Sequence, residues 1–350
     1  MERKFVKFMF AFSLIVFVWI TLFSKQEFIE SENRTAAKFS LFSPDGYFTD
    51  CLPLRDSLMR INRDISLAMG KNEFSGAFFG KNGYIFSNEE GSIQTLEKNL
   101  LAVEDFSKLI DTKVCIVPSK TDALISLLPR FFESGRGELW QRVSDSCGYV
   151  ADAFSTLRLA GANGKYIYYR GDHHLTSLGS YYLYKSLASA LGIVTFGAED
   201  FSVSIVKNNF SGSDARKMLT VTDDKITLFR YKGDGDFTVE NCDAKTSYKG
   251  LYNYGKLNSN DPYGVFPLPD CGHVRITHGE GRETVLIVCD SYGDSLAPFL
   301  ARHFDLDIID PRYFGGSVKE LIGENNYTAA LVCFGIDTLA GKEILYKLKV

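Results

Sequence analysis

Apolar runs and helix-like segments alternate towards the carboxyl end of the chain. The apolar runs occupy residues 284–290, 306–310 and 327–336, and segments with helical spacing occupy 291–304 and 317–325. Strands that alternate with helices in this way indicate βαβ units, whose strands run parallel in one sheet. Ligands of such sheets bind beyond the carboxyl ends of the strands. The pattern therefore predicts an α/β fold and directs attention to the residues that follow each strand.

The alternation starts near residue 80. Short apolar, strand-like runs lie at 82–88 and 113–120, and helices are expected at 93–112, 121–134, 138–148 and 176–192. Pro129 would kink or end the second of these helices. Short strands are also expected in "YVADAF" and "YIYYR". Thr176 and Gly192 suit the two ends of the last helix, as N-cap and terminal glycine. We therefore expect one α/β domain over residues 80–350, preceded by a linker and N-terminal extension at 30–79.

Residues 193–280 interrupt this alternation. Gly, Asn, Asp and Ser are dense in this stretch, and short β-like runs such as "KITLFRY" and "HVRITHG" appear. Such runs, bounded by turn residues, are typical of strands joined by loops. We interpret residues 193–280 as a β-rich insertion or subdomain within the larger domain.

The first residues combine a basic start with an apolar run. Arg3, Lys4 and Lys7 precede or interrupt an apolar stretch that continues without charge over residues 8–23. This run is close to the lower limit of the roughly 17–25 residues that span a bilayer, and no small-residue cleavage site follows it. We expect residues 1–29 to form a cytoplasmic tip and a transmembrane signal-anchor, with the rest of the chain outside the cytoplasm. A cleaved signal peptide is the alternative.

Charge and cysteine spacing argue against two classes of function. The formal net charge of −4 does not suggest nucleic-acid binding, and no CxxC or Cys/His spacing suggests structural zinc. Cys115, Cys289 and Cys333 lie in apolar runs and are expected to be small buried hydrophobes. Cys242 and Cys271 flank a turn-rich segment and are a candidate pair if the compartment is oxidising.

A serine, a histidine and an aspartate together suggest nucleophilic catalysis. Ser291 comes just after the run that ends at Cys289, and a helix is expected to begin at once. Its hydroxyl would therefore lie near N–H groups at a helix N-terminus, which stabilise an oxyanion. His174 can serve as the base that serine requires, because the pKa of histidine lies near neutrality. Asp172 is placed to orient that ring, which gives a Ser–His–Asp set in the chain order Asp, His, Ser.

Five blocks of sequence, in the same order, resemble those of one family. The blocks are "GKNGYIFS" (80–87), "VPSK" (117–120), "YYRGDHHLTSLGSYYLYKSL" (168–187), "DPYGVF" (261–266) and "CDSYGDSLAPFLARHFDLDIIDPRYF" (289–314). The third block resembles the Asp-His-His-Trp-Thr signature of the DHHW branch of the SGNH hydrolase superfamily, which includes AlgX- and AlgJ-like proteins. The resemblance covers roughly residues 80–340.

This resemblance implies a permuted SGNH-hydrolase-like domain, with a flavodoxin-like parallel sheet and flanking helices. Members of known role include O-acetyltransferases that modify exported polysaccharides outside the membrane, beside a membrane-bound O-acyltransferase. Carried over by motif, Ser291 is the nucleophile, His174 the base and Asp172 the orienting acid. By analogy an acetyl group would pass to Ser291 and then to a sugar hydroxyl. The resemblance implies no cofactor, and a partner or a small molecule would supply the acetyl donor.

The sequence departs from the family pattern at two positions. Leu175 stands where the Trp of the signature is usual, and Cys289 replaces the glycine of the superfamily's Gly-Asp-Ser block. A literal Gly-Asp-Ser occurs at 293–295, but Ser295 lies about one turn into the expected helix and is less able to attack. The oxyanion groups are not assigned by spacing, and the role of Asp337 near the last strand's end stays open.

Five residues are candidates for substrate binding or support: His173, Tyr292, Asp290, Arg312 and Lys120. His173 suits a structural role or donation of a hydrogen bond to another residue of the site, and three of the others also have a simpler alternative. Asp290 suits a helix cap, and Lys120 suits a structural role. Arg312 suits an acidic sugar, an oxyanion or a pair with Asp310.

Asp172 and His174 have the alternative of capping the helix near Thr176. A metal site at residues 172–174 is disfavoured, because the other histidines are scattered along the chain. The sequence therefore predicts a membrane-anchored, extracytoplasmic polysaccharide O-acetyltransferase. An esterase with the same triad and a non-catalytic polysaccharide-binding or scaffold protein of an export complex are the alternatives.

Overall fold

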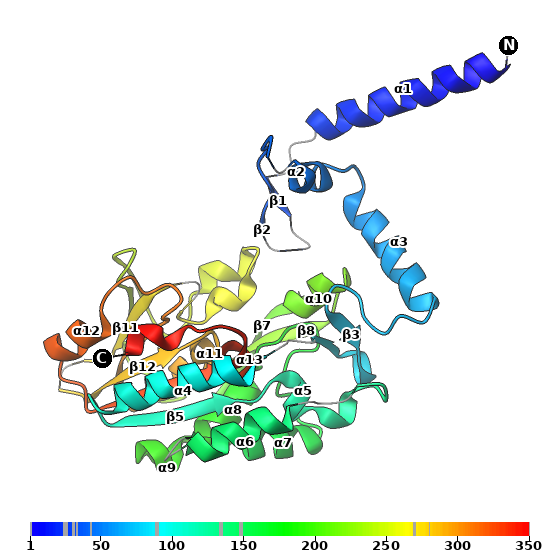
Figure 1. Cartoon of the computed structure of the whole chain (residues 1–350). Helices are drawn as coiled ribbons and strands as arrows, with labels where there is room; N and C mark the ends of the chain where they lie inside the picture. Colours follow the sequence, from blue (N-terminus) through cyan, green and yellow to red (C-terminus); the bar gives the residue numbers. More distant parts are fainter. Residues whose placement is uncertain are drawn as a thin grey trace.

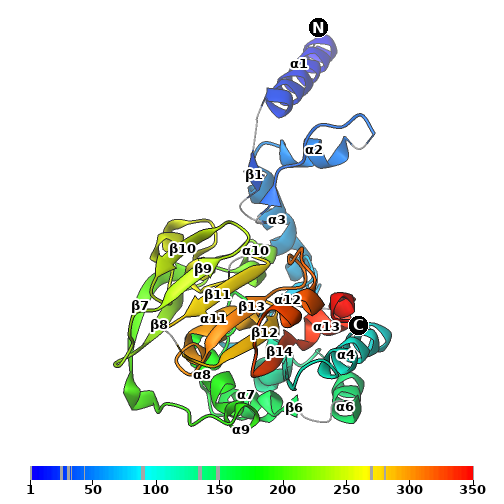
Figure 2. The same ribbon diagram turned by 90° about the vertical axis from the view of Figure 1, so that its left-hand side faces the viewer.

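A computed structural model describes most of the 350-residue chain. The described residues are 2–23, 27–29, 32, 34–42, 44–87, 91–132, 136–146, 150–268, 271–279 and 281–349. Figures 1 and 2 show a body in which helices flank a central sheet, with the N-terminal elements standing away from it.

The central sheet is mixed. Among the described residues its order is β10 (Thr246–Lys249), β9 (Thr238–Asn241), β11 (His273–Thr277), β13 (Asp305–Ile309), β12 (Thr284–Cys289), β14 (Ala329–Gly335), β5 (Thr112–Val117) and β6 (Val150–Ala151). The strands from β13 to β6 are parallel, whereas β11, β9 and β10 are antiparallel to their neighbours. The α/β class is confirmed, and the expectation of a purely parallel sheet is wrong at one edge.

Residues 193–280 do not fold apart from the rest of the body. They supply β9, β10 and β11 to the central sheet, and they form an antiparallel ribbon of β7 (Phe201–Phe210) and β8 (Asp224–Tyr231). Short helical turns lie before and between these strands: η4 (Ala198–Asp200), α10 (Ser213–Lys217), η5 (Tyr254–Asn258) and η6 (Pro262–Val265). The segment therefore enlarges the existing sheet and places its loops beside it.

Helices cover both faces of the sheet (Figure 2). One face packs α5 (Lys120–Ala123), α7 (Ala153–Ala162), α8 (Ser177–Ser186), α9 (Ala188–Leu191) and α11 (Tyr292–Leu300). The other packs α4 (Ile93–Ser107), α6 (Gly137–Ser146), α12 (Val318–Glu324), α13 (Ile336–Gly341) and η7 (Leu345–Leu348). Alternate residues of β12 enter the two cores, with Ile287 and Cys289 on one face and Val288 on the other. Near-continuous apolar runs follow from this burial on both faces.

Of two helices expected from the sequence, one forms and the other does not. The helix expected at 176–192 forms as α8 and α9, with Thr176 accepting the N–H of Gly179 and Gly192 ending it at φ 63°. The continuous helix expected at 121–134 is wrong, since within residues 121–132, the part that the structure describes, only α5 and a 3₁₀ turn, η3 (Ile125–Leu127), are present. The backbone is already extended at Leu128, because a residue that precedes proline disfavours the helical conformation.

The two short strands expected before α8 are largely absent from the described chain. Of "YVADAF" only β6 is a strand, and α7 begins at Ala153. Within "YIYYR" an isolated bridge joins Tyr168 to Leu175. The chain instead makes a tight excursion there, which carries the Asp-His-His block.

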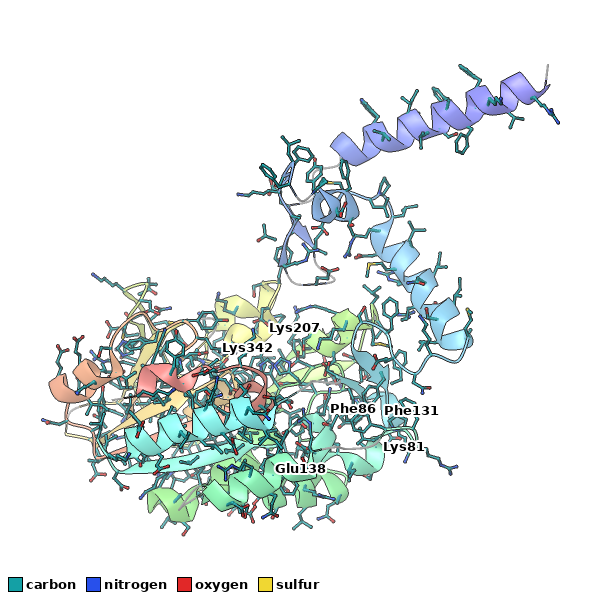
Figure 3. The ribbon with its side chains drawn as sticks, in the orientation of Figure 1. Lys81, Phe86, Phe131, Glu138, Lys207 and Lys342 are labelled. Atoms are coloured by element: carbon teal, nitrogen blue, oxygen red, sulfur yellow. The ribbon has the colours of Figure 1, made fainter. Side chains whose placement is uncertain are left out.

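A small hairpin closes the body next to α5. β3 (Ala77–Phe79) pairs with β4 (Ile85–Ser87) around the 3₁₀ turn η2 (Lys81–Gly83). Phe86 is fully buried, and its ring lies 5.8 Å from that of Phe78, which also contacts Phe131 (Figure 3). The hairpin therefore adds an aromatic cluster to the core on the face of the sheet that packs α5 and α7.

Three cysteines lie side by side in the sheet, as expected for small buried hydrophobes. Cys289 pairs in register with Cys333, and Cys333 with Cys115; all three are fully buried. Cys242 and Cys271, the candidate pair, are both free thiols.

The N-terminal part consists of α1 (Glu2–Phe23) and an N-terminal arm, residues 27–68, with β1 (Phe28–Ile29), β2 (Arg34–Thr35), α2 (Asp45–Asp50) and α3 (Arg55–Ala68). Buried Asp50 holds the arm together by accepting both terminal nitrogens of Arg34 at 2.7 Å. Arg63 of α3 donates to the carbonyl of Leu219 at 3.1 Å and joins the arm to the body. No helix in the described part of the chain has both the length and the apolarity to span a membrane.

Candidate active site

The turn that follows β12 is built around a buried aspartate. One carboxylate oxygen of Asp290 accepts the N–H of Tyr292 at 3.1 Å. The other accepts the N–H of Gly335 at 3.0 Å and the hydroxyl of Thr338 at 2.7 Å. Asp290 therefore ties the start of α11 to the end of β14. Ser291, the residue just before α11, is thereby held at the carboxyl edge of the sheet.

A second turn brings the Asp-His-His block to the same edge. The N–H of Thr176 bonds to the carbonyl of Ile167 at 2.9 Å, which closes the loop between them. Buried Lys120 supports the loop from below, donating to the carbonyl of Asp172 at 2.8 Å and pairing with Asp214 at 2.5 Å. Lys120 is thus a structural residue that positions the loop.

Asp172, His174 and Ser291 form a continuous chain of hydrogen bonds. The imidazole Nδ1 of His174 lies 2.5 Å from Oδ1 of Asp172, and Nε2 lies 2.9 Å from Oγ of Ser291. His174 is therefore close enough to Ser291 to act as the base that a serine nucleophile requires, and Asp172 is close enough to His174 to orient its ring. The structure therefore brings together the three residues that the sequence singled out.

Electrostatics favour an ionised carboxylate beside a basic imidazole. Burial alone would raise the pKa of Asp172, but the charges of His174 and His173 and the hydrogen bonds from His174 hold it well below its usual range. Burial lowers the pKa of His174, but the charge and hydrogen bond of Asp172 outweigh it, so that this pKa is raised. The ionised carboxylate of Asp172 therefore favours the protonated form of the His174 ring.

The far side of Asp172 is fixed by a glycine and a serine. The N–H and hydroxyl of Ser213 donate to Oδ2 at 2.7 and 3.2 Å. A Cβ on Gly212 would lie 1.9 Å from the same oxygen, so only glycine fits there. Ser213 also bonds to Nδ1 of His173 at 2.8 Å, which gives His173 a supporting place beside the acid. The sequence alone did not indicate Gly212 or Ser213. Both belong to the segment 193–280, about 40 residues after Asp172, and only the folding of that segment brings them to the site.

A tyrosine covers the base. The ring of Tyr263 stacks on that of His174, with centroids 4.0 Å apart and planes 17° from parallel. The Tyr263 hydroxyl donates to Ser295 at 2.9 Å, and Ser295 bonds to Ser180 at 2.6 Å. Ser295 is buried and supports this tyrosine, which agrees with its rejection as the nucleophile. Tyr263 lies in the "DPYGVF" block, which was the one sequence signal that could have identified it.

Leu175 and Tyr292 contribute to packing and hydrogen bonding around the triad. Leu175, which stands where Trp is usual, is fully buried in the core. It packs below the loop and does not line the pocket. The Tyr292 hydroxyl donates to the carbonyl of His173 at 3.2 Å and joins α11 to the loop.

A pocket of about 200 Å³ opens over Ser291 and His174. The other polar residues that line it are His173, Asp261, Tyr263, Asp294, Asp310, Arg312 and Tyr313. Arg312 donates Nε and Nη2 to Asp310 at 3.0 and 2.6 Å. Arg312 thus forms the expected pair with Asp310, and it also lines the pocket.

Asp294 stands out in this pocket. It follows Ser291 by three residues, which places the two side chains on one face of α11. Its side chain is almost fully buried, and its Oδ1 has no hydrogen-bond partner. Burial, followed by the charge of Asp310, raises the pKa of Asp294 well above its usual range. Asp294 is therefore a buried carboxyl group beside the serine, with a raised pKa.

Two of the N–H groups at the start of α11, which were expected to stabilise an oxyanion, already donate hydrogen bonds within the protein. The N–H of Tyr292 bonds to the Asp290 carboxylate, and the N–H of Gly293 bonds to the Asp290 carbonyl at 2.9 Å. Asp337, whose role was open, forms an ion pair with Arg136 away from Ser291. Arg312 is the cationic side chain that faces the pocket.

Asp172, His173 and His174 also offer ligand atoms within 4.8 Å of one another. Two of these atoms, Oδ1 of Asp172 and Nδ1 of His174, already bond to each other. A metal ion would have to break this bond, whereas acid–base chemistry uses it.

The DHHW family is matched by residues 147–309, under the description "DHHW protein". The resemblance expected from the sequence blocks is thus confirmed over this segment, which contains the triad and most of the pocket. No curated protein matches the chain.

Several solved structures share the fold. A DHHW family protein from Eubacterium siraeum superposes with a TM-score of 0.63 and 18% identity, covering 79% of this chain and 96% of its own. PatB1 from Bacillus cereus, solved with a sulfonyl adduct, gives 0.64 and 17%, covering 78% and 99%. The O-acetyltransferase domain of Pseudomonas putida AlgJ gives 0.48 and 14%, covering 78% and 98%. The first two likenesses establish that this chain has their fold.

Proposed function

We propose that the protein is a serine acyltransferase that moves an acetyl group onto a hydroxyl of a polysaccharide. The hydrogen-bonded chain from Asp172 through His174 to Ser291 carries this proposal. The resemblance of the sequence blocks to polysaccharide O-acetyltransferases supports the choice of substrate. The intact triad argues against the alternative of a non-catalytic polysaccharide-binding protein.

In the first half-reaction, Nε2 of His174 removes the proton of Ser291 while Oγ attacks the carbonyl carbon of an acyl donor. The donor's leaving group takes the proton from His174 as its bond to the acyl carbon breaks, and an acyl-serine ester remains. Asp172 stabilises the imidazolium between these two transfers. Arg312 faces the pocket and is the residue we expect to stabilise the developing oxyanion.

In the second half-reaction, His174 removes a proton from a sugar hydroxyl, whose oxygen attacks the acyl-serine carbonyl. Ser291 leaves with the proton from His174, and the sugar carries the ester. Water in place of the sugar would make the same residues an esterase. The pocket of about 200 Å³ leaves room for a small acyl group and little more, so the acceptor enters from outside.

We further propose that the domain works outside the cytoplasm, with a membrane-bound O-acyltransferase as the supplier of acetyl groups. Support comes from the basic residues Arg3, Lys4 and Lys7 ahead of the apolar run at 8–23, and from the family resemblance. Protease accessibility of a C-terminal tag in intact cells tests this location.

A labelling experiment tests the central proposal. The purified chain is incubated with an activated acetyl ester, and peptide mass spectrometry locates the acetyl group. We expect the label on Ser291, loss of label in Ser291→Ala, and normal label in Ser107→Ala, which changes an exposed serine on α4. Faster transfer to added sugar oligomers than to water identifies a transferase. A folded protein that takes no label on Ser291 would contradict the proposal.

A further inference from the structure

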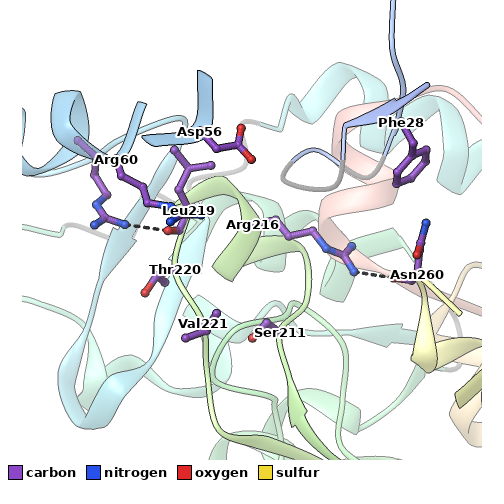
Figure 4. A pocket seen from close by; sticks show the side chains of 10 residues that line it. Phe28, Asp56, Arg60, Ser211, Arg216, Leu219, Thr220, Val221 and Asn260 are labelled. Atoms are coloured by element: carbon purple, nitrogen blue, oxygen red, sulfur yellow. Dashed lines mark hydrogen bonds between the residues drawn. The ribbon is translucent and has the colours of Figure 1, made fainter. Parts of the chain in front are cut away.

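A second and larger cavity lies between the N-terminal arm and the body, with a volume of about 570 Å³ (Figure 4). Ligand sites commonly have volumes of about 300–1,000 Å³. Helix α3 and strand β1 form one wall, and the α10 region and the loop at Asn260 form the other. The cavity is therefore made by two parts of the chain that are far apart in sequence.

The walls of this cavity are strongly basic. Arg60, Arg63 and Arg216 line it, and Asp56 is the one carboxylate among the described lining residues. Asp56 already accepts a hydrogen bond from Arg55 at 2.9 Å, which reduces its attraction for the cavity arginines. The cavity therefore carries an excess of positive charge in a chain whose net charge is −4.

Two of the three guanidinium groups are held in place by backbone carbonyls. Arg216 donates Nη2 to Asn260 at 3.1 Å, and Arg63 donates Nη1 to Leu219 at 3.1 Å (Figure 4). The carbonyl of Asn260 fixes the guanidinium of Arg216 without neutralising it. Arg63 also pairs with Asp64, whose Oδ1 lies 2.7 Å from its Nη2, so part of its charge is offset. Arg60 is exposed on the face of α3 that lines the cavity.

This cavity shares its inner wall with the triad. Ser211 and Arg216 line the cavity, and between them Ser213 bonds to Asp172 and His173. On the other side, Asn260 lines the cavity and the next residue, Asp261, lines the pocket over Ser291. The cavity and the pocket over Ser291 are therefore lined by neighbouring residues of the same segments.

We propose that this arginine-lined cavity binds a carboxylate or phosphate group of a carbohydrate chain whose neighbouring unit lies at Ser291. Guanidinium groups match the planar, bidentate geometry of both anions. The description of that chain as the acyl acceptor rests on the proposed function. The anion site itself does not, since it follows from the arginines and the position of the cavity.

The test measures binding by the full chain in detergent, in phosphate-free buffer, by titration calorimetry. The probes are an oligogalacturonate, which carries carboxylates, a glycerol-phosphate oligomer, which carries phosphates, and a neutral cello-oligosaccharide of similar length. Arg60→Ala and Arg216→Ala are compared with Lys71→Ala, which removes an exposed charge just beyond α3 and outside the cavity. Melting temperatures confirm that each variant is folded.

We expect at least one anionic oligomer to bind at least tenfold more tightly than the neutral one. Arg60→Ala and Arg216→Ala should each weaken that binding roughly three- to tenfold, and Lys71→Ala should leave it unchanged. Added salt should weaken it as well. Equal binding of neutral and anionic oligomers, or equal losses from the Lys71 and arginine variants, would overturn the proposal.

The same measurements separate this site from the proposed chemistry. Anion binding that depends on Arg60, with no acetyl label on Ser291, refutes the transferase and leaves the anion site. Label on Ser291 with no such binding refutes the anion site alone. Binding to anionic lipid vesicles that depends on Arg60, without oligomer binding, would assign the cavity to lipid headgroups and overturn the carbohydrate proposal.

Discussion

The ring of Tyr263 lies flat against that of His174, with the ring centroids 4.0 Å apart. The contact fixes the plane of the imidazole, whose two nitrogens must point at Asp172 and Ser291 at the same time. The hydroxyl of Tyr263 is anchored in turn on buried Ser295. The "DPYGVF" block thus contributes a cover for the base.

Changing this cover should lower activity in two steps. Tyr263→Phe keeps the stacked ring and loses the hydrogen bond to Ser295, so we expect a loss of acyl transfer of no more than about threefold. Tyr263→Ala frees the imidazole and should lower kcat roughly 10- to 100-fold, in line with the cost of a misplaced catalytic group. Rates of acetyl transfer measure both. Equal losses in the two variants would show that the hydroxyl, and not the stack, matters.

The triad predicts a pH profile. His174 acts as a base only when neutral, and Asp172 raises the pKa of its ring. The rate should therefore rise with pH through a value above the ordinary histidine pKa of about 6.5. Asp172→Asn removes the cause of the raised pKa, so the rising limb should move to lower pH while kcat falls by about 10³–10⁴. Profiles of kcat/KM for both proteins check this, and an unmoved limb would contradict it.

Gly212→Ala tests how closely Asp172 is held. The added Cβ would lie 1.9 Å from Oδ2, so the carboxylate must move away from His174. We expect a loss of activity of about 100-fold or more with the fold retained, since a small displacement of a catalytic group can cost that much. Gly323→Ala on α12, where nothing lies within 4 Å of the new Cβ, is the matched control and should be fully active.

Lys120 should matter for stability. It forms a buried ion pair with Asp214 and donates to backbone carbonyls of the Asp172 loop. Lys120→Met leaves Asp214 charged and buried, which should cost about 3–5 kcal/mol of unfolding free energy. Denaturant titration measures the loss. The double variant Lys120→Met/Asp214→Asn removes the stranded charge, and it should recover part of the loss if the ion pair is responsible.

Asp294 predicts an unusual dependence of stability on pH. Its raised pKa means that the native state keeps a proton that the unfolded state releases. Stability should therefore fall as pH rises above about 3.9, the value of an unperturbed aspartate, until the native pKa is passed. Asp294→Asn does not titrate, so its stability relative to the parent should grow by up to about 1.4 kcal/mol per pH unit in that window. Urea titrations at several pH values measure this difference, and a constant difference would show that Asp294 is ionised.

The triad could be predicted because its residues occur in short, distinctive blocks, each at the end of an expected strand or the start of an expected helix. The residues that hold the triad in place could not be predicted from the sequence. Gly212, Tyr263 and Asp214 reach the site from distant parts of the chain, and Lys120 meets Asp214 across 94 residues. Such partners depend on how loops pack, which local sequence patterns do not describe.

The errors in the fold have a similar origin. The stretch 193–280 was recognised as β-rich, and β11 as a β-like run, but the pairing of β9, β10 and β11 with the edge of the main sheet depends on register between distant strands. The helix expected at 121–134 failed because its apolar residues suit a buried turn as well as a helix, and Pro129 decides between them. Periodicity predicted the type of most elements, and tertiary contacts determined where several of them ended.

The hydrogen bonds from the end of β14 to the Asp290 carboxylate affect when the site can form during synthesis. The carboxylate that shapes the Ser291 turn bonds to Gly335, 45 residues further along the chain, and to Thr338. A nascent chain that has emerged only as far as α11 already contains the base and the serine, but lacks the strand that sets the serine in place. The protein is therefore expected to become reactive only late in its synthesis, so that a partly made chain does not consume acyl donor.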